Sequence, residues 1–327
     1  MTVWFRQANL RGMSAKLTFI LGCTACGKGG LGRELARRLG GEIISVDSMK
    51  VYRRMDIGTA KPSPEVLREI PHHLIDVVEP SEEFSVARYV LLAEQAIADI
   101  SARGRPILVV GGTPLYIKAL SEGLFEGPGA DPGVRARLQE TAARDGAAVL
   151  HARLLEVDPP ASRRIHPNDL RRLVRALEVF ELTGTPISRL QEQWDRDRTR
   201  HECTFVGLRR DKEDLSQRIN ERVRKMFTLG LVDEVRSLCA EAKPLSTAAR
   251  QAVGYSETLA HLEGKLTLAE AVESVKINTR QLAKSQRTWF RRFARTEWID
   301  VGPNATAEGL AEQLLARPES LWSTSPR

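Results

Sequence analysis

A glycine-rich loop between a short apolar segment and a helical segment constrains this chain most. Residues 18–21 (TFIL) have the character of a buried strand, and residues 31–39 have helical periodicity. A strand, a glycine loop and a helix in this order are the context of a phosphate-binding loop. Its eight residues are Gly22, Cys23, Thr24, Ala25, Cys26, Gly27, Lys28 and Gly29.

This loop has the chemistry to bind a diphosphate. Glycines let successive backbone N–H groups converge on anionic oxygens at a helix N-terminus, and Lys28 adds a positive charge aimed at the terminal phosphates. The alternative is a glycine-rich turn that only links strand to helix. The spacing of Gly22, Gly27 and Lys28 favours the phosphate-binding loop.

Gly29 departs from the usual motif. The residue after the lysine is normally Ser or Thr, whose hydroxyl binds Mg²⁺. We expect Mg²⁺ as a cofactor, and with Gly29 the ion would depend on water or another oxygen ligand. The sequence identifies no metal-ligating side chain, and His72 and His73 lack zinc-ligand spacing with another His or Cys.

The order of strand and helix signals predicts an α/β fold with a doubly wound parallel sheet. Strand signals near Thr18, Ile43 and residues 107–110 alternate with helical stretches such as residues 84–103. Gly and Pro punctuation over residues 123–132 marks a boundary. Only helical periodicity follows, up to about residue 200, before a further strand at residues 203–208 and helices rich in Arg and Lys.

Asp47 lies at the C-terminal end of a second predicted strand, residues 43–46 (IISV). Ligands of open α/β sheets bind at the carboxyl ends of the strands. A carboxylate at this place is a candidate general base.

Several ordered motifs closely resemble the tRNA dimethylallyltransferase family. They are residues 45–62 (SVDSMKVYRRMDIGTAKP), 71–76 (PHHLID), 109–116 (VVGGTPLY), 165–169 (IHPND), 171–179 (RRLVRALEV), 218–222 (RINER), 251–255 (QAVGY) and 279–284 (TRQLAK). The phosphate loop alone is shared with many nucleotide kinases, whereas the run at residues 47–62 is specific to this family. The resemblance spans about residues 17–300.

The resemblance implies a fold and a division of the chain. It implies a P-loop NTPase-like parallel-sheet core, residues 15–122 and 202–327, interrupted by a helical insertion domain, residues 123–201, that contacts tRNA. Residues 1–14 are expected to be an N-terminal extension.

The resemblance also implies a reaction and a catalytic set. A dimethylallyl group passes from dimethylallyl diphosphate to the exocyclic N6 amine of adenosine 37, next to the anticodon, in tRNAs that read codons beginning with U; diphosphate is released. Asp47 accepts the proton of the amine, Thr24 and Arg222 lie near the bridging oxygen of the diphosphate, and Thr113 lies at the far mouth of the reaction channel. The loop with Lys28 holds the diphosphate.

For the anticodon loop of tRNA, the resemblance implies contacts from two segments and two single residues: Asp47, Ser48, Met49, Lys50, Thr113, Arg135, Arg171, Arg172, Leu173, Val174 and Arg175. Arg172 and Arg175 are three residues apart and share a helix face. The alternative for these two is a solvated face with local ion pairs to Glu178 and Glu181.

Composition agrees with a nucleic-acid substrate. The net charge of +7 and the pI of about 9.4 suit a polyanionic partner. No apolar run approaches the roughly 20 residues that span a membrane, and the four cysteines form neither a disulfide framework nor a zinc pattern. We therefore expect a cytoplasmic protein that binds no membrane. We also expect a monomer.

Three alternatives remain open at this stage. One is an isopentenyltransferase that acts on free adenine nucleotides, and another is a weakly active tRNA-binding paralogue, because Gly29 replaces the usual Thr or Ser. The third, a P-loop kinase, gives the run at residues 47–62 no role. Five positions depart from the family pattern: Cys23, Cys26 and Gly29 in the loop, and Lys50 and Arg171, each in place of a common Gln.

Overall fold

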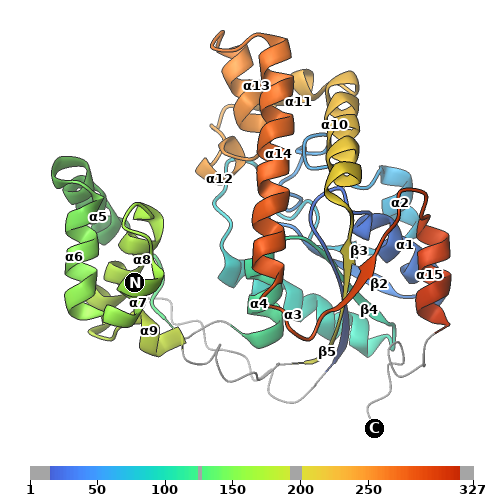
Figure 1. Ribbon diagram of the computed structural model, residues 1–327, viewed down its shortest axis with the longest axis horizontal. Coiled ribbons are helices and arrows are strands. Elements are labelled where there is room, and N and C mark those ends of the chain that lie inside the picture. Colours follow the sequence, from blue (N-terminus) through green and yellow to red (C-terminus); the bar gives the residue numbers. More distant parts are fainter. Residues whose placement is uncertain (1–14, 124–126, 192–200, 317–327) are drawn as a thin grey trace. The chain divides into compact units, whose positions relative to one another are not determined.

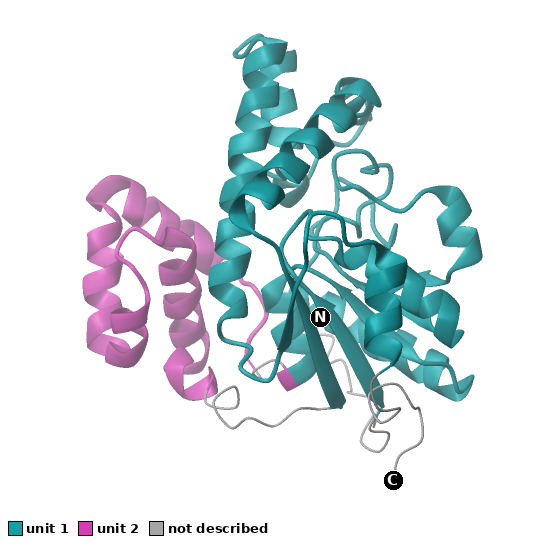
Figure 2. Ribbon diagram, turned by 45° about the vertical axis from the view of Figure 1, so that its right-hand side comes forward, with its two compact units in different colours: residues 1–121, 200–327 teal, residues 122–199 magenta. Residues whose placement is uncertain are grey.

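The computed structural model describes residues 15–123, 127–191 and 201–316 (Figure 1). It divides the chain into two compact units, one formed by residues 1–121 with 200–327 and the other by Glu122–Thr199 (Figure 2). The insertion expected from sequence was residues 123–201. The expected N-terminal extension lies outside the described residues.

The first unit is built on a six-stranded sheet with strand order β3-β2-β4-β1-β5-β6. Every neighbouring pair is parallel. The strands are β1 (Lys16–Leu21), β2 (Glu42–Val46), β3 (His72–His73), β4 (Ile107–Gly111), β5 (Glu202–Arg209) and β6 (Glu297–Asp300). Every residue of β2 and β4 is buried, as expected for a parallel sheet covered on both faces. This confirms the predicted α/β class with a parallel sheet.

Helices cover this sheet because each parallel crossover needs one. In the first unit they are α1 (Lys28–Leu39), α2 (Pro64–Glu69), α3 (Val86–Ala102), α4 (Pro114–Glu122), α10 (Lys212–Thr228), α11 (Leu231–Cys239), α12 (Thr247–Arg250), α13 (Tyr255–Leu262), α14 (Leu268–Phe290) and α15 (Ala307–Leu315). Leu31 and Leu35 of α1 pack in one core cluster with Ile20, Val110 and Leu314, so α1 is held between the sheet and α15.

The long helix α14 begins at a capping box. The Thr267 hydroxyl accepts from the Glu270 N–H, and the Glu270 carboxylate accepts from the Thr267 N–H. From there α14 runs beside α10 (Figure 1). A second core cluster joins α11 and α13 to the segment after β2, with Val51, Tyr52 and Met55 among its buried members.

The second unit contains only helices among its described residues: α5 (Pro132–Asp145), α6 (Ala147–Val157), α7 (Pro159–Arg164), α8 (Leu170–Thr183) and α9 (Ile187–Leu190). Asp131 and Asp169 cap α5 and α8 by accepting from backbone N–H groups in the first turn. The unit has its own core, which includes Leu138, Leu154 and Leu177. The predicted helical character of this segment is confirmed.

No helix in the described ranges is both long and apolar enough to cross a membrane.

Candidate active site

The phosphate loop connects β1 to α1 in a tight turn that requires glycine at its start. Gly22 has a φ of +150°, and a Cβ on it would lie 2.5 Å from Cys26 Sγ and 3.0 Å from the Leu208 carbonyl oxygen. Gly27, with a φ of +104°, leads into α1. The first N–H groups of α1 have no partner within the helix, so the loop and the helix end together can offer backbone donors to an anion.

Three cationic side chains hold the backbone carbonyls of this loop. Lys28 Nζ donates to the Cys23 carbonyl (3.0 Å), Arg218 Nε to the Ala25 carbonyl (3.2 Å), and Arg210 Nε to the Cys26 carbonyl (2.9 Å). Arg218 of α10 and Arg210, which follows β5, therefore hold the loop in place through its carbonyl groups. Arg218 and Arg210 had no predicted role.

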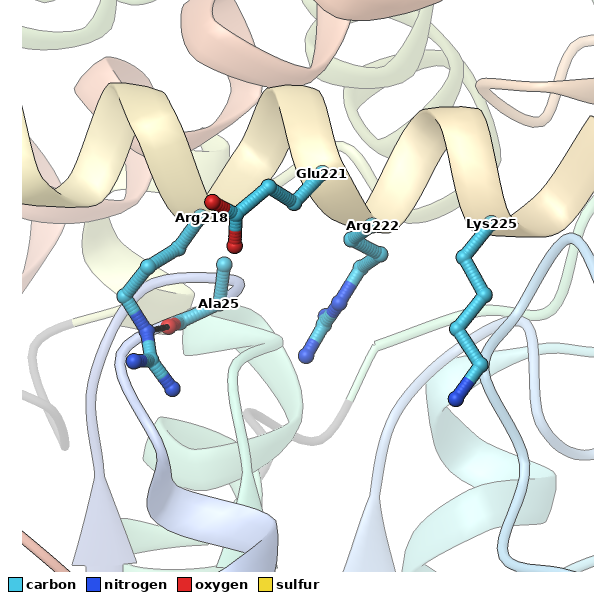
Figure 3. Close-up of a pocket in the computed structure, with 5 residues that line it drawn as sticks. All are labelled: Ala25, Arg218, Glu221, Arg222 and Lys225. Atoms are coloured by element: carbon cyan, nitrogen blue, oxygen red, sulfur yellow. Dashed lines mark hydrogen bonds between the residues drawn. The ribbon is translucent and has the colours of Figure 1, made fainter.

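Arg222 and Thr24 come together, as the resemblance implies. Arg222 Nη1 donates to Thr24 Oγ1 over 3.3 Å, although 198 positions separate them in the sequence. Burial lowers the pKa of the Arg222 guanidinium, and the nearby Arg218 lowers it further. A pocket of about 270 Å³ adjoins this pair (Figure 3). It is lined by Ala25, Arg218, Glu221, Arg222 and Lys225.

Asp47 follows β2 and begins a turn with its own carboxylate. Oδ1 accepts from the N–H groups of Met49 (2.9 Å) and Lys50 (3.4 Å). The half-buried carboxylate is close enough to Arg222 and Lys50 for its charge to oppose the lowering of the pKa that burial causes in both. The structure therefore gathers Asp47 with the phosphate-site arginine.

Thr113 follows β4 and fixes the turn that carries Asp47. Its Oγ1 accepts from the Ser48 N–H (3.1 Å), and its own N–H donates to the Val46 carbonyl (3.2 Å). Gly111 permits this approach, since a Cβ on it would lie 2.0 Å from the Val46 carbonyl oxygen. Thr113 thus has a positioning role that the sequence did not reveal.

Gln286 of α14 links the phosphate loop to this second turn. Its Oε1 accepts from the Thr24 N–H (2.8 Å), and its Nε2 donates to the Gly112 carbonyl (2.6 Å). Sequence reasoning missed Gln286, which lies 262 positions from Thr24 and just after the TRQLAK motif. The spacing of residues along the chain carries no signal for such a bridge.

The run at residues 47–62 is shaped by Glu234 of α11. The Glu234 carboxylate accepts from the N–H groups of Asp56 (2.9 Å), Ile57 (2.7 Å) and Gly58 (3.2 Å). It also accepts from the Tyr255 hydroxyl (2.6 Å). One carboxylate on a neighbouring helix therefore satisfies three consecutive backbone donors.

Lys61 closes the same run from the other side. Its side chain is only 3% exposed, and its Nζ donates to the Tyr52 carbonyl (2.5 Å), to Asp56 (2.6 Å) and to Asp76 (2.5 Å). A buried ammonium with three oxygen acceptors locks the segment. Glu234 and Lys61 together therefore fix the backbone of this run.

Gly58 is expected to tolerate no side chain, because a Cβ on it would lie 2.4 Å from Tyr255 Cε2. Replacing it with Ala should lower the free energy of unfolding by about 1–3 kcal/mol, measured by urea denaturation. Gly302→Ala is the matched control, since nothing lies within 4 Å of a Cβ there. Equal stability of the two variants would contradict the packing described for residues 47–62.

Lys50 joins a cluster of cations around the phosphate loop. Burial lowers the pKa of its ammonium from the ordinary value of 10.5 to about 8. The charge of Asp47 opposes this shift, whereas Lys28, Arg222 and Arg33 add to it. Four cations therefore face the same region, where an anionic ligand would relieve their repulsion.

Lys50→Gln should stabilise the ligand-free protein at pH 7. Because the folded-state pKa is about 8 against 10.5, the unfolded chain binds more protons between these values, and wild-type stability rises with pH there. The advantage of the variant in melting temperature should therefore be largest below pH 8 and shrink toward pH 10. An advantage that stays constant across this window would contradict a buried, charged Lys50.

In the second unit, the arginines of the tRNA prediction divide into two groups. Arg135 Nε and Arg175 Nη1 donate to the fully buried carboxylate of Glu178, over 2.8 and 2.6 Å. Glu178 also accepts from the Asp131 N–H (2.8 Å). Arg135 and Arg175 thus organise the unit around one buried charge, as in the ion-pair alternative for Arg175.

Arg171 and Arg172 are exposed at the start of α8 and are accessible to a partner. Arg172 pairs with Asp169, not with Glu178, over 3.2 Å. Leu173 and Val174, which the resemblance implied as tRNA contacts, are 0% and 4% exposed in the core of the unit. The face of α8 that carries these two side chains packs inward, so a tRNA contact at these positions stays a prediction.

Comparisons with known proteins identify the family of this chain. The family model described as IPP transferase matches residues 50–293. The tRNA dimethylallyltransferase of Geobacter sulfurreducens is 47% identical over 298 residues, which cover 91% of this chain and 96% of that protein. The one from Geobacter metallireducens is 48% identical over 285 residues, covering 87% and 92%.

Solved structures give the same result. The tRNA isopentenylpyrophosphate transferase of Bacillus halodurans is 40% identical with a TM-score of 0.67, covering 92% of this chain and 96% of its own. A eukaryotic dimethylallyltransferase captured acting on tRNA is 29% identical with a TM-score of 0.72, covering 88% and 74%. With a family model that matches most of its length and relatives at nearly half identity, this chain belongs to the IPP transferase family.

Proposed function

We propose that this protein is a tRNA dimethylallyltransferase that uses dimethylallyl diphosphate and modifies N6 of adenosine 37 in tRNAs reading codons that begin with U. The observation that supports this most is the gathering of Thr24, Arg222 and Asp47 beside one phosphate loop. A phosphate-binding loop by itself accounts for the presence of Thr24 only. A carboxylate at the same place suits transfer to an amine.

The proposed reaction breaks one bond and forms one. The bond between the allylic carbon and the diphosphate oxygen breaks, and diphosphate leaves with the electron pair. The amine nitrogen bonds to the allylic carbon, and its proton passes to Asp47. The loop N–H groups, Lys28 and Arg222 stabilise the charge that develops on the leaving diphosphate.

Mg²⁺ remains part of the proposal as a companion of the diphosphate. Position 29 offers no hydroxyl ligand, and the described residues hold no group of three or more His, Cys, Asp or Glu suited to a metal. The ion would therefore be held by diphosphate oxygens and water, with added charge neutralisation as its contribution.

A tRNA acceptor is favoured over a free adenine nucleotide by the exposed arginines of the helical unit. Its exposed Arg171 and Arg172 offer charge to phosphates of an anticodon loop. Taking a base from a single-stranded loop into the site costs less than extracting it from a duplex. The proposal places the enzyme in the cytoplasm as a monomer.

The deciding experiment combines purified protein, Mg²⁺ and dimethylallyl diphosphate with unmodified tRNA reading U-starting codons, followed by mass analysis of the nucleosides. Dimethylallyladenosine in tRNA, with none on AMP supplied as a parallel acceptor, supports the proposal. Product on AMP alone would identify the protein as an isopentenyltransferase that acts on free adenine nucleotides. Absence of product with tRNA still bound would indicate the weakly active paralogue.

Replacing both Arg171 and Arg172 with Ala should weaken tRNA binding about tenfold and reduce the slope of log affinity against log salt by about 2, because two phosphate contacts are lost. The matched control replaces Arg163 and Arg164, which are also adjacent and exposed in the helical unit. Equal loss in both double variants, measured by filter binding across a salt series, would show that only net charge matters.

A further inference from the structure

Arg33 of α1 lies beside the loop position that has lost its hydroxyl. A Cβ built on Gly29 would be 3.4 Å from Arg33 Nη1, which is van der Waals contact. Arg33 is one helical turn after Gly29, so its side chain folds back toward the N-terminus of α1, the direction that helical side chains favour. The guanidinium therefore lies against the residue where the phosphate-loop motif places the Mg²⁺ ligand.

Gly29 leaves the space beside the guanidinium open. Its φ is outside the left-handed range, so no backbone strain demands glycine there. A Ser or Thr would put further atoms beyond the Cβ, next to Nη1, and would compete with the guanidinium for the same space. The pair Gly29 and Arg33 is thus sterically complementary.

The charge of Arg33 is not compensated within the described part of the chain. Burial lowers the pKa of its guanidinium, and Arg37 lowers it further, while no carboxylate there forms an ion pair with it. Arg37, one turn further along α1, does pair with both Glu34 and Glu69. Arg33 also lowers the pKa of Lys50, so its charge reaches the cation cluster of the site.

Such an arrangement is unfavourable until an anion arrives. The N-terminus of α1 carries positive partial charge, and Lys28, Lys50 and Arg222 add three more cations to the same region. A planar guanidinium can donate to two phosphate oxygens at once, which an ammonium does not match. The site is therefore electrostatically prepared for a diphosphate by protein groups alone.

We propose that the Arg33 guanidinium, admitted by Gly29, binds the diphosphate in place of the usual hydroxyl-held Mg²⁺, so that diphosphate binding does not require the metal. The inference rests on the proposed function for the identity of its ligand. Lys50, which stands where the family commonly has Gln, contributes to the same neutralisation. Mg²⁺ that is bound by the substrate then adds affinity to a protein–diphosphate complex that already forms without the metal.

The test is calorimetric titration of the full chain with inorganic pyrophosphate, once in EDTA and once in Mg²⁺. The wild type should bind in EDTA with an affinity within about threefold of that in Mg²⁺. Arg33→Leu should lower the EDTA affinity at least about tenfold, since a charge-assisted pair of hydrogen bonds is lost. Arg37→Leu, which removes the same charge from the same helix, should change it less than about twofold.

A second variant converts the site. Gly29→Thr combined with Arg33→Leu restores the motif hydroxyl and removes the guanidinium, so it should bind pyrophosphate in Mg²⁺ but at least about tenfold more weakly in EDTA. Melting curves establish that each variant is folded. Retention of the EDTA affinity in Arg33→Leu would overturn the role of Arg33.

Failure of this inference is distinguishable from failure of the proposed function. Wild-type binding of pyrophosphate only in Mg²⁺ would overturn the inference, while dimethylallyladenosine formed in the tRNA assay would leave the transferase assignment intact. No pyrophosphate binding in either buffer, together with no product on tRNA, would overturn both.

Discussion

Replacing Asp47 with Asn is expected to lower turnover on tRNA by about 10²–10⁴-fold, because the amide cannot accept the proton of the attacking amine. The affinity for tRNA should change little. Asn keeps an oxygen that can accept from the Met49 N–H, so the turn after β2 is retained. Single-turnover rates of dimethylallyladenosine formation, with tRNA binding measured separately, distinguish an effect on catalysis from an effect on tRNA affinity.

Asp56→Asn is the matched control for this substitution. Asp56 belongs to the same run of residues, but its carboxylate is bound by Lys61 and its side chain is 59% exposed. We expect its turnover to stay within about threefold of wild type, since Asp76 and the Tyr52 carbonyl still hold Lys61. Turnover by Asp47→Asn close to that of this control would remove Asp47 as the base.

Replacing Arg222 with Met should lower turnover by about 10²–10³-fold, because the leaving diphosphate loses a preorganised cation at its bridging oxygen. Thr24→Val should lower turnover through the same contact, since Arg222 Nη1 donates to the Thr24 hydroxyl. In the proposed mechanism the two residues act on one oxygen, so the double variant should be much less impaired than the product of the single losses.

Arg224→Met provides the control on the same helix. Arg224 is exposed on α10 and is not among the residues that line the pocket beside the loop. Its substitution should leave single-turnover rates nearly unchanged. Losses that multiply fully between Arg222→Met and Thr24→Val would show that the two side chains serve separate steps.

The sequence predicted features whose physical basis is local. The phosphate loop is set by backbone freedom at Gly22 and Gly27 and by the strand and helix on either side. Asp47 could be placed because the end of a buried strand is recognisable from four consecutive apolar or small residues. The helical unit was predicted from periodicity, which needs no knowledge of tertiary contacts.

Short elements and buried faces were less accessible. The strand β3 has two residues and β6 has four, too few for a pattern to be recognised. On α8, spacing placed Arg172 and Arg175 on one face, but the burial of Glu178 decides that Arg175 turns inward. The side chains of Leu173 and Val174 are inaccessible because they face the core of the unit.

The sequence by itself therefore determined the phosphate loop, the position of the candidate base and the alternation of strands and helices, because these depend on neighbours along the chain. Only the tertiary structure decided which groups hold the site together. Gln286, Glu234 and Arg218 each bind backbone atoms more than 170 positions away. The same holds for Arg33, whose relation to the loop depends on the direction of a side chain and the space left by Gly29.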